Sequence, residues 1–393
     1  MIKFLFFFSF FLILYSYAGY GILLYVLLRL KKWFSRSAQP GPIPALEPDV
    51  TLIVPAFNEA GFIREKIRNC LELDYPADKL RLIFISDGSN DGTADIIREE
   101  NRIILMHEQV RLGKLNAMNR AMKTVTTPFV VFSDANTLLN PEALKRMMRH
   151  YTDPRIGGVT GEKRILAESK GRASIAGEGI YWKYESWLKR LDSDWNTVIG
   201  AAGELFSLRT ILYKDPGQGI IIEDFVLSMQ VCLQGFLIRY EPGAVATESA
   251  SLSIKEEQKR KIRIAAGAFQ AMSLLSGLFN VFRYPALSFQ FISHRMLRWT
   301  FCPLCLVVLA VTNTILFWQG AGGLYTVFFL AQIVFYAVAL LGWIFANRNV
   351  RIRAFYLPYY FLFMNLSVFT GFFRWLSGKQ PAVWEKARRH TFT

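Results

Sequence analysis

Between residues 80 and 93 the chain reads Leu80-Arg81-Leu82-Ile83-Phe84-Ile85-Ser86-Asp87-Gly88-Ser89-Asn90-Asp91-Gly92-Thr93. A short apolar run bounded by a polar loop is typical of a buried strand. The loop is rich in Asp, Asn and Gly, which an ordinary turn also uses, so alone it predicts only a connector. The same pattern of strand and loop recurs between residues 40 and 260, and the recurrence predicts the fold class.

Short strand-like runs alternate with helix-like stretches through this polar part of the chain. The predicted strands are 50–54, 80–85, 102–106 and 129–132, and the predicted helices are 59–71, 93–100, 115–123 and 141–150. Alternation at this spacing predicts an α/β domain, with a mostly parallel sheet flanked by helices. The last helix is expected to begin with Asn140 as its cap and Pro141 at its first position.

Oxygen-bearing side chains follow three of the predicted strands directly. They are Asn58 and Glu59 after the first, Asp87 after the second, and Asp134 and Asn136 after the fourth. Ligands bind such sheets at the carboxyl ends of the strands. Carboxylate and amide oxygens there can accept hydrogen bonds from a base or ribose, or ligate Mg²⁺ or Mn²⁺. Three such loops in register therefore predict a binding site, although any one alone favours a turn.

The composition excludes an ordinary soluble protein and a disulfide scaffold. Of 393 residues, 52% are hydrophobic and 20% charged, with four cysteines. Cys302 and Cys305 lie in an apolar run without a second pair, so we expect packing residues and no zinc site. The formal charge of +15 suits nucleic acid, anionic lipid or a phosphate-bearing substrate. Because many basic residues flank apolar helices and no recognition motif occurs, no nucleic-acid partner is predicted.

The first apolar run predicts a membrane anchor. Residues 4–28 contain no charge, and this run exceeds the roughly 20 residues that a helix needs to cross a bilayer. A cleaved signal peptide is the alternative, but its apolar core of roughly 7 to 15 residues is shorter. By the positive-inside rule, the segment after the anchor lies in the cytoplasm, because the run is followed by Arg29, Lys31, Lys32 and Arg36.

Two more apolar stretches lie near the C-terminus. Residues 299–347 are uncharged, and Gln319–Gly323 divides them into a predicted hairpin of two membrane helices. Another uncharged run, 354–373, follows a basic turn. If it also spanned, the basic tail would end outside, against the positive-inside rule. Either this run is re-entrant or residues 266–282 insert more deeply; we expect a cytoplasmic tail and leave the number of spans open.

The motifs and their order resemble those of family 2 glycosyltransferases, in particular the membrane-integrated branch of cellulose, hyaluronan and poly-N-acetylglucosamine synthases. The segments that carry the resemblance are Val54-Pro55-Ala56-Phe57-Asn58-Glu59, Asp87-Gly88-Ser89-Asn90-Asp91-Gly92-Thr93, Gly113-Lys114-Leu115-Asn116-Ala117-Met118-Asn119, Asp134-Ala135-Asn136, Gly203-Glu204 and Glu223-Asp224. Apolar helices and a basic tail with Trp384 and Arg388 follow them. The resemblance implies a GT-A fold, which is Rossmann-like with a mostly parallel sheet, together with transmembrane helices.

The resemblance also implies a role for each matching residue. The nucleotide-sugar donor would be bound by Pro55, Asn58, Glu59, Asp87, Lys114 and Asp134, with Lys114 near the diphosphate. The cofactor, Mg²⁺ or Mn²⁺, would be held by Asp134 and Asn136. The general base would be Asp224, beside Glu223. The acceptor would be bound by Gly203, Glu204 and Arg263.

Sugar transfer needs these residue types whatever the family. Cleavage of a sugar–diphosphate bond releases negative charge, which a divalent ion and Lys114 can neutralise. The attacking hydroxyl loses a proton, for which Asp224 is the candidate base. Glu223 either raises the pKa of Asp224 or binds the acceptor, and both acids also suit a helix N-terminus. Direct displacement inverts the anomeric carbon, so an α-linked donor gives a β-linked product.

Three motifs depart from the family's pattern. Asn136 replaces the second Asp of D-x-D, and Ile222 replaces the Thr of T-E-D. Ile264 stands where Q-x-x-R-W has its Trp, so only Arg263 and Gly267 fit that motif. A polysaccharide synthase and an enzyme that adds one sugar to a lipid-linked acceptor therefore both remain open. A catalytically silent membrane scaffold with this fold is a third possibility.

The expected organisation is an anchor over 1–36, a catalytic domain over 40–254, interfacial helices over 255–297, transmembrane helices over 298–376 and a basic tail over 377–393. We expect an integral protein of a bacterial cell membrane with a cytoplasmic catalytic domain, whose partners are lipid, a UDP-sugar and a glycan or lipid-linked acceptor. The basic residues of 255–263 either bind phosphate groups of lipid or of a bound diphosphate, or form a solvated basic face. Aromatic residues that either stack on sugars or, as we favour, pack at the membrane interface are Tyr181, Trp182, Tyr184, Trp187 and Trp195.

Overall fold

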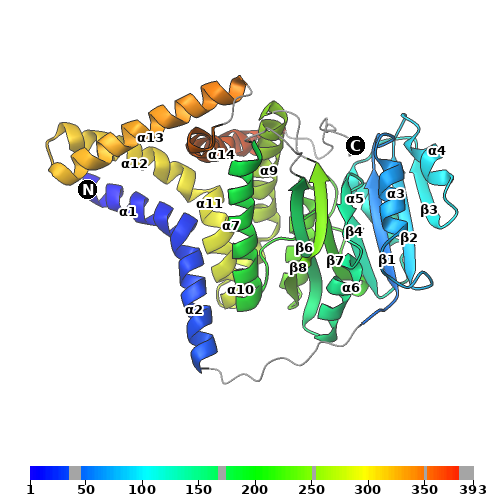
Figure 1. Cartoon of the computed structure of the whole chain (residues 1–393). Helices are drawn as coiled ribbons and strands as arrows, with labels where there is room; N and C mark the ends of the chain where they lie inside the picture. The colour runs from blue at the N-terminus through cyan, green and yellow to red at the C-terminus, as the bar shows by residue number, and fades with distance from the viewer. Residues whose placement is uncertain (35–45, 167–173, 250–253, 349–351, 380–393) are drawn as a thin grey trace.

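The computed structural model describes residues 1–34, 46–166, 174–249, 254–348 and 352–379, and within them the strands form one eight-stranded sheet (Figure 1). The strand order is β3-β2-β1-β4-β7-β6-β8-β5. β1 pairs in parallel with β2 and β4, whereas β7 runs antiparallel to β4 and β6. The strands are β1 Val50–Ala56, β2 Leu80–Asp87, β3 Ile103–Glu108, β4 Phe129–Ser133, β5 Thr137–Leu139, β6 Ile156–Leu166, β7 Leu205–Arg209 and β8 Leu237–Ser249. The predicted α/β class is confirmed.

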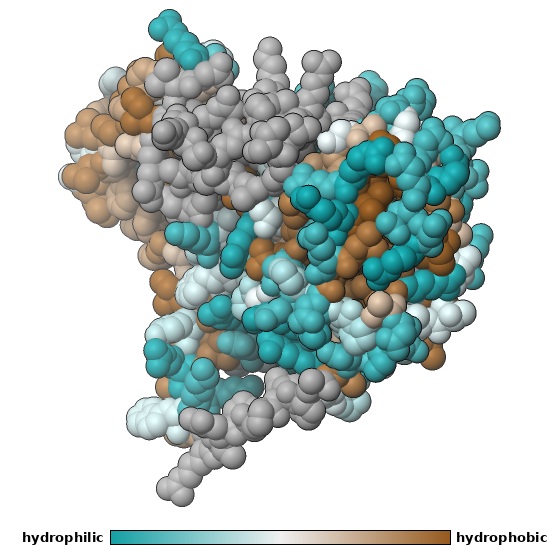
Figure 2. Space-filling model, turned by 45° about the vertical axis from the view of Figure 1, so that its right-hand side comes forward, coloured by the Kyte–Doolittle hydropathy of each residue, from teal (hydrophilic) through white to brown (hydrophobic). Residues whose placement is uncertain are grey.

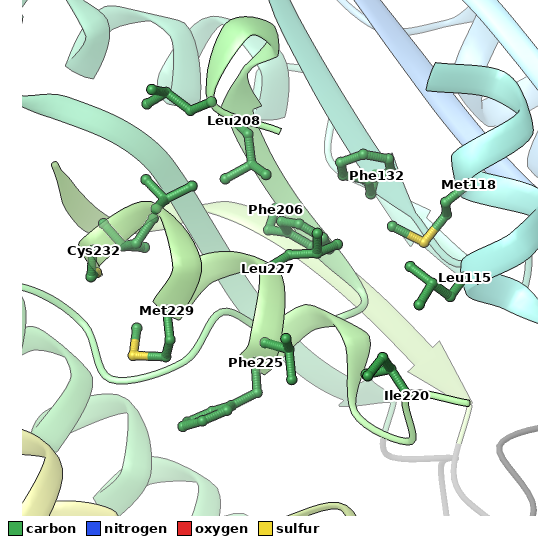
Figure 3. Close-up of a cluster of buried hydrophobic side chains, with 14 of the residues drawn as sticks. Leu115, Met118, Phe132, Phe206, Leu208, Ile220, Phe225, Leu227, Met229 and Cys232 are labelled. Carbon is green, nitrogen blue, oxygen red and sulfur yellow. The ribbon is translucent and has the colours of Figure 1, made fainter. Parts of the chain in front are cut away.

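Alternating side chains of the strands supply two apolar cores, one on each face of the sheet. Ile53 of β1 points into one core, and its neighbours Leu52 and Val54 point into the other, as the period of two requires. Figure 3 shows part of the first core, in which side chains of α5 and α8 pack against Phe132 and Phe206 of the sheet. The flanking helices are α3 Ile63–Leu71, α4 Thr93–Arg98, α5 Lys114–Met122, α6 Ala143–Met148 and α8 Glu223–Leu233.

The strand order creates a switch point between β1 and β4. From β1 the chain continues outward to β2 and β3, and it then returns to place β4 on the other side of β1. The loops that leave the carboxyl ends of β1 and β4 therefore diverge, and the space between them is where open α/β sheets bind ligands. The polar loops predicted from the sequence lie at this edge.

One predicted helix start is wrong in its detail. Asn140 does not cap α6, which begins at Ala143. Instead, the Asn140 side chain accepts a hydrogen bond from the backbone N–H of Val245 at 2.7 Å and donates one to the carbonyl of Gly243 at 3.1 Å. The amide therefore ties the β5–α6 turn to β8, a long-range partner that satisfies it in place of the local helix end.

Within the described residues, three helices are long and apolar enough to cross a membrane. They are Ile2–Phe34, which comprises α1, a π-turn and α2, together with α12 Phe301–Trp318 and α13 Gly323–Asn347. Figure 1 shows α1, α12 and α13 extending together away from the sheet, and Figure 2 shows hydrophobic surface over this region. The predicted hairpin with its turn after Trp318 is confirmed, and Cys302 and Cys305 are buried in α12 as expected.

The last apolar run forms α14 Arg353–Leu376, which is not one of the three candidate spans. It packs along α9 Ile254–Leu274, where a Cβ on Gly371 would lie 2.5 Å from the Cβ of Ala265. The rings of Phe269 and Phe372 meet in the same contact, with centroids 5.0 Å apart. This packing places the last apolar run beside α9. The side of the membrane on which the tail lies stays a prediction. The tail after residue 379 lies outside the described residues.

A buried polar junction joins the first apolar helix to α7 and α11. The π-turn Tyr15–Gly19 bends this helix, and Arg298 donates to the Ser16 carbonyl at 3.0 Å (Figure 1). The other end of the Arg298 guanidinium lies 2.8 Å from a carboxylate oxygen of Glu185 in α7 Ser174–Trp195. Tyr184 donates to the Tyr17 carbonyl at 2.5 Å, so side chains of α7 and α11 both bind the irregular turn.

A second part of the same junction contains a fully buried histidine. His294 Nδ1 lies 2.6 Å from a carboxylate oxygen of Asp192, and the Tyr20 hydroxyl donates to the other oxygen at 2.5 Å. His294 belongs to a π-turn, Ile292–Met296, that follows α10 Pro285–Phe291 and precedes α11 Leu297–Trp299. Trp187 packs on Gly21 of α2 and Tyr184 binds the turn before it, so both lie between helices of the protein. Their predicted place at the membrane interface stays a prediction.

Loss of the central carboxylate should destabilise the whole protein. Glu185→Gln leaves Arg298 and Arg295 without their buried counter-charge, which costs about 3 to 5 kcal/mol when one partner of a buried pair is removed. We expect a clearly lower melting temperature in detergent. Glu72→Gln, at an exposed carboxylate beside Arg68, is the control and should not change the melting temperature measurably. Equal melting temperatures for the two variants would contradict a stabilising junction.

Candidate active site

The ammonium group of Lys114 joins three segments at the carboxyl edge of the sheet. It lies 2.7 Å from Oδ1 of Asp134, after β4, and 2.9 Å from Oε1 of Glu223, at the start of α8. Burial alone would lower the pKa of Lys114, but the charges of Asp134, Glu223 and Asp224 outweigh burial and raise it above its usual value. Lys114 is therefore a fixed cation, as a site for a diphosphate requires.

Glu223 and Asp224 begin α8 and differ in their electrostatic surroundings. Burial opposes ionisation of Glu223, but its contact with Lys114 lowers its pKa below the usual value. Burial and the adjacent charge of Glu223 raise the pKa of Asp224 to about 7. One oxygen of Asp224 accepts a hydrogen bond from the backbone N–H of Phe225 at 2.9 Å. The pair thus combines an ionised carboxylate with one that exchanges a proton near neutral pH.

The predicted acceptor segment lies against Asp224. A Cβ on Gly203 would stand 3.0 Å from Oδ2 of Asp224, so any larger residue here would crowd the carboxylate. Glu204, the next residue, forms an ion pair with the buried ammonium of Lys163, which also pairs with Glu248 of β8. Burial opposes ionisation of Glu204, but Lys163 outweighs it and lowers the pKa of Glu204.

Arg263 lies on α9, which packs behind the start of α8. Its guanidinium donates to the Ile221 carbonyl at 3.2 Å. A Cβ on Gly267, one turn further, would lie 2.9 Å from the side chain of Ile222. The residues that match the Q-x-x-R-W motif therefore hold the backbone that leads into Glu223, and Arg263 is within electrostatic range of both acids.

The loops after β1 and β2 are hydrogen-bonded to each other. Asn58 has a positive φ of 53°, which Asn tolerates better than most residues, and its side chain accepts from the N–H of Asn90 at 2.9 Å. The N–H of Glu59 donates to the hydroxyl of Thr93 at 2.8 Å. These bonds explain why α3 begins only at Ile63, later than predicted, because the residues before it bind the neighbouring loop.

Asp87 is almost fully buried at the end of β2, with 3% of its surface exposed. Its carboxylate accepts a hydrogen bond from the N–H of Gly113 at 2.7 Å, and the N–H of Leu112 lies 3.2 Å away. Gly113 has a φ of 96° and directly precedes Lys114. Asp87 therefore holds the backbone that presents the Lys114 ammonium, a contact that the sequence did not reveal.

A second buried lysine, Lys66 of α3, was missed by the sequence analysis. Its ammonium donates to the hydroxyl of Ser133 at 2.7 Å and to the Thr137 carbonyl at 2.8 Å, on both sides of the Asp134–Asn136 turn. The signal was its place on the apolar face of the helix, four residues before Cys70 and three after Ile63. Lys66 fixes the turn that carries the predicted metal ligands.

The predicted site residues thus fall into one ion-paired cluster and one hydrogen-bonded rim. Lys114, Asp134, Glu223 and Asp224 lie together, with Gly203, Glu204 and Arg263 beside them. The rim at the ends of β1 and β2 contains Pro55, Asn58, Glu59 and Asp87, and Asp87 joins it to the cluster through Gly113. Their roles in binding and catalysis stay predictions.

Residues 51–207 match the family model described as glycosyl transferase family 2. These residues form a glycosyl transferase family 2 domain. Poly-beta-1,6-N-acetyl-D-glucosamine synthase of Staphylococcus aureus (strain MSSA476) is 30% identical over 234 residues, which are 57% of this chain and 55% of the relative. The synthase of Staphylococcus epidermidis is 26% identical over 344 residues, 84% of this chain and 81% of the relative. This chain spans about half the length of the Staphylococcus aureus relative that it matches.

A solved structure shares the fold of this family 2 glycosyltransferase. The mannosyltransferase PcManGT from Pyrobaculum calidifontis, in complex with GDP-Man and Mn²⁺, superposes with a TM-score of 0.69 at 22% sequence identity. The likeness covers 96% of this chain and 100% of that chain. The resemblance and the GT-A-like fold inferred from the sequence are therefore confirmed.

The raised pKa of Asp224 predicts a pH-dependent loss of stability. Its pKa is about 7 in the folded protein against an ordinary 3.8, so ionising it weakens the fold as the pH rises from about 4 to 7. Asp224→Asn removes this cost and should stabilise the protein at pH 8 by on the order of 4 kcal/mol. The gain should vanish near pH 4, as followed by thermal unfolding.

The matched control is Asp215→Asn, at an exposed carboxylate outside the cluster. It should shift the melting temperature equally at pH 4 and pH 8. If Asp224→Asn behaves like this control, folding does not raise the pKa of the Asp224 carboxyl group.

Proposed function

We propose that this glycosyltransferase transfers a sugar from a nucleotide-sugar donor, with inversion, to a glycan hydroxyl at the cytoplasmic face of a membrane. The observation that carries the proposal is the bridge of Lys114 between Asp134 and Glu223, with Asp224 next to it and Gly203 facing the Asp224 carboxylate. A cation for the leaving group and a base for the acceptor thus lie within one cluster, at the edge where α/β sheets bind nucleotides.

The proposed reaction is a single displacement. The acceptor oxygen attacks the anomeric carbon, and the bond from that carbon to the diphosphate oxygen breaks. The acceptor's proton moves to the carboxylate of Asp224, whose pKa near 7 suits a base at neutral pH. The charge that develops on the diphosphate is stabilised by the ammonium of Lys114. Attack opposite the leaving group converts an α-linked donor into a β-linked product.

The donor set at the end of β4 fits a hard divalent cation completed by the substrate. The oxygens of Asp134 and Asn136 lie on one turn, which Lys66 fixes. Among the described residues, no group of three or more His, Cys, Asp or Glu side chains is placed to hold a metal ion. Mg²⁺ or Mn²⁺ would therefore be held by Asp134 and Asn136 together with diphosphate oxygens, and it would neutralise the leaving group.

Two classes of product fit the site. The Staphylococcus relatives are named as synthases of a β-1,6-N-acetylglucosamine polymer, which supports transfer to a growing glycan from UDP-N-acetylglucosamine. Ile264, in the place of the acceptor tryptophan of the Q-x-x-R-W motif, favours addition of one sugar to a lipid-linked acceptor. The two donors to compare first are UDP-N-acetylglucosamine and GDP-mannose.

Removal of the proposed base should abolish transfer and spare donor binding. We expect Asp224→Asn in lipid nanodiscs to transfer at least about 100-fold more slowly than the wild type with Mg²⁺ or Mn²⁺, since general-base catalysis supplies about 10² to 10⁴. Nucleotide affinity, measured by calorimetry, should change less than about threefold. Asp215→Asn is the control and should transfer normally. Equal transfer by Asp224→Asn and the control would refute the assignment of the base.

The pH profile gives an independent check. Only ionised Asp224 accepts a proton, so kcat/KM should rise with pH through an acidic limb near pH 7. Glu223→Gln removes the adjacent negative charge and should move that limb to lower pH. A limb that stays in place in Glu223→Gln would show that another group titrates.

A further inference from the structure

The most unusual charge outside the Lys114 cluster is Lys189 of α7. It is buried, with 7% of its surface exposed. Within the described part of the chain, its ammonium forms no hydrogen bond or ion pair. Its Nζ is not one of the fully buried polar atoms that lack a partner, so the ammonium group keeps some exposed surface through which a ligand could supply hydrogen-bond acceptors.

Lys189 lies between carboxylates that belong to the acceptor side of the site. Burial lowers its pKa, and the charges of Glu162, Glu204 and Glu185 partly restore it. Glu204 is also within electrostatic range of Asp224. Lys189 is therefore close to the segment Gly203–Glu204, which contacts the proposed base.

The helix face that carries Lys189 also carries an aromatic ring and a hydroxyl. Trp182, Ser186 and Lys189 are spaced by four and three residues, so they lie on one face of α7. The Ser186 hydroxyl donates to Glu162 of β6 at 2.7 Å. The ammonium of Lys163 lies 5.4 Å from the centre of the Trp182 ring and pairs with Glu204. These groups connect α7 to the segment beside Asp224.

The charges around Lys189 select the chemical class of the ligand. The charges that act on Lys189 are three carboxylates and one guanidinium: Glu162, Glu204, Glu185 and Arg295. A phosphate beside Lys189 would also meet Glu162 and Glu204, which repel it. A neutral polyol accepts from an ammonium, donates to carboxylates and stacks on an aromatic ring.

We propose that Lys189, Glu162 and Trp182 bind a neutral sugar ring of the acceptor glycan next to the hydroxyl that is glycosylated. This inference rests on the proposed function and deepens it, because it names the side chains that recognise the acceptor. Because Ile264 of α9 provides no aromatic ring at the tryptophan position of Q-x-x-R-W, we assign the stacking contact with the sugar ring to Trp182 of α7. Lys189 donates to a sugar oxygen, and Glu162 accepts from a sugar hydroxyl.

The test replaces Lys189 by a side chain of similar length without the charge. Lys189→Met in nanodiscs should bind a β-1,6-linked N-acetylglucosamine tetrasaccharide about 10- to 100-fold more weakly, as expected for a lost hydrogen bond from a charged donor. UDP affinity should stay within about twofold. The melting temperature should stay equal or rise, because the variant no longer buries an unpaired charge. A structural role would give the opposite change in stability.

Lys183→Met, at an exposed lysine of the same helix, is the matched control and should bind tetrasaccharide and UDP as the wild type does. Lys189→Arg should retain part of the tetrasaccharide affinity. Direct binding separates this inference from the proposed function, which fails instead if the wild type transfers sugar from neither donor.

Three results would overturn the inference. In the first, Lys189→Met binds the tetrasaccharide as tightly as the wild type. In the second, its melting temperature, UDP affinity and tetrasaccharide affinity all fall together, which indicates a structural lysine. In the third, Lys189→Met loses affinity for a polyprenyl phosphate but not for the tetrasaccharide, which indicates an anion site.

Discussion

The ion pairs of Lys114 constrain the site more than any other contact. A buried ammonium is costly without partners, so α5, the turn after β4 and the start of α8 must meet at one point. Because Glu223 takes the contact with this cation, its pKa falls, while burial and the charge of Glu223 raise the pKa of Asp224. The pKa values of two adjacent carboxyl groups therefore differ widely. Such a difference allows one group to stay ionised while the other accepts a proton.

The backbone around this cation is irregular, and long-range hydrogen bonds stabilise it. Gly113 adopts a positive φ directly before Lys114, and the buried carboxylate of Asp87 binds its N–H. The ammonium of Lys66 similarly binds Ser133 and Thr137, which lie on either side of the turn that contains Asp134. The strand order places these turns at the switch point between β1 and β4. Topology therefore determines where the charges meet, and buried polar side chains determine how firmly they are held.

The sequence predicted the elements that depend on local patterns and missed those that depend on distant partners. The period of the apolar residues located β1 to β4 and the helices between them, and the uncharged runs located the hairpin of α12 and α13. Asn140 was predicted as a cap because its partner Val245, in β8, lies far along the chain and local sequence cannot reveal it. The roles of Lys66 and Lys189 escaped notice for the same reason: lysines are usually solvated, and only tertiary packing shows that these two are buried.

The two halves of the site are supported by different parts of the protein. The loops proposed to bind the donor are built from the sheet and bind each other, as Asn58 and Asn90 do. The segment that leads to Gly203 is held instead by helices beside the membrane anchor: Gln290 donates to the Thr197 carbonyl at 3.1 Å, and Arg295 donates to the Ile199 carbonyl at 3.3 Å. Arg298, on the next turn, binds the anchor itself. The proposed acceptor segment is therefore tied to the apolar helices, whereas the proposed donor loops are tied to the sheet.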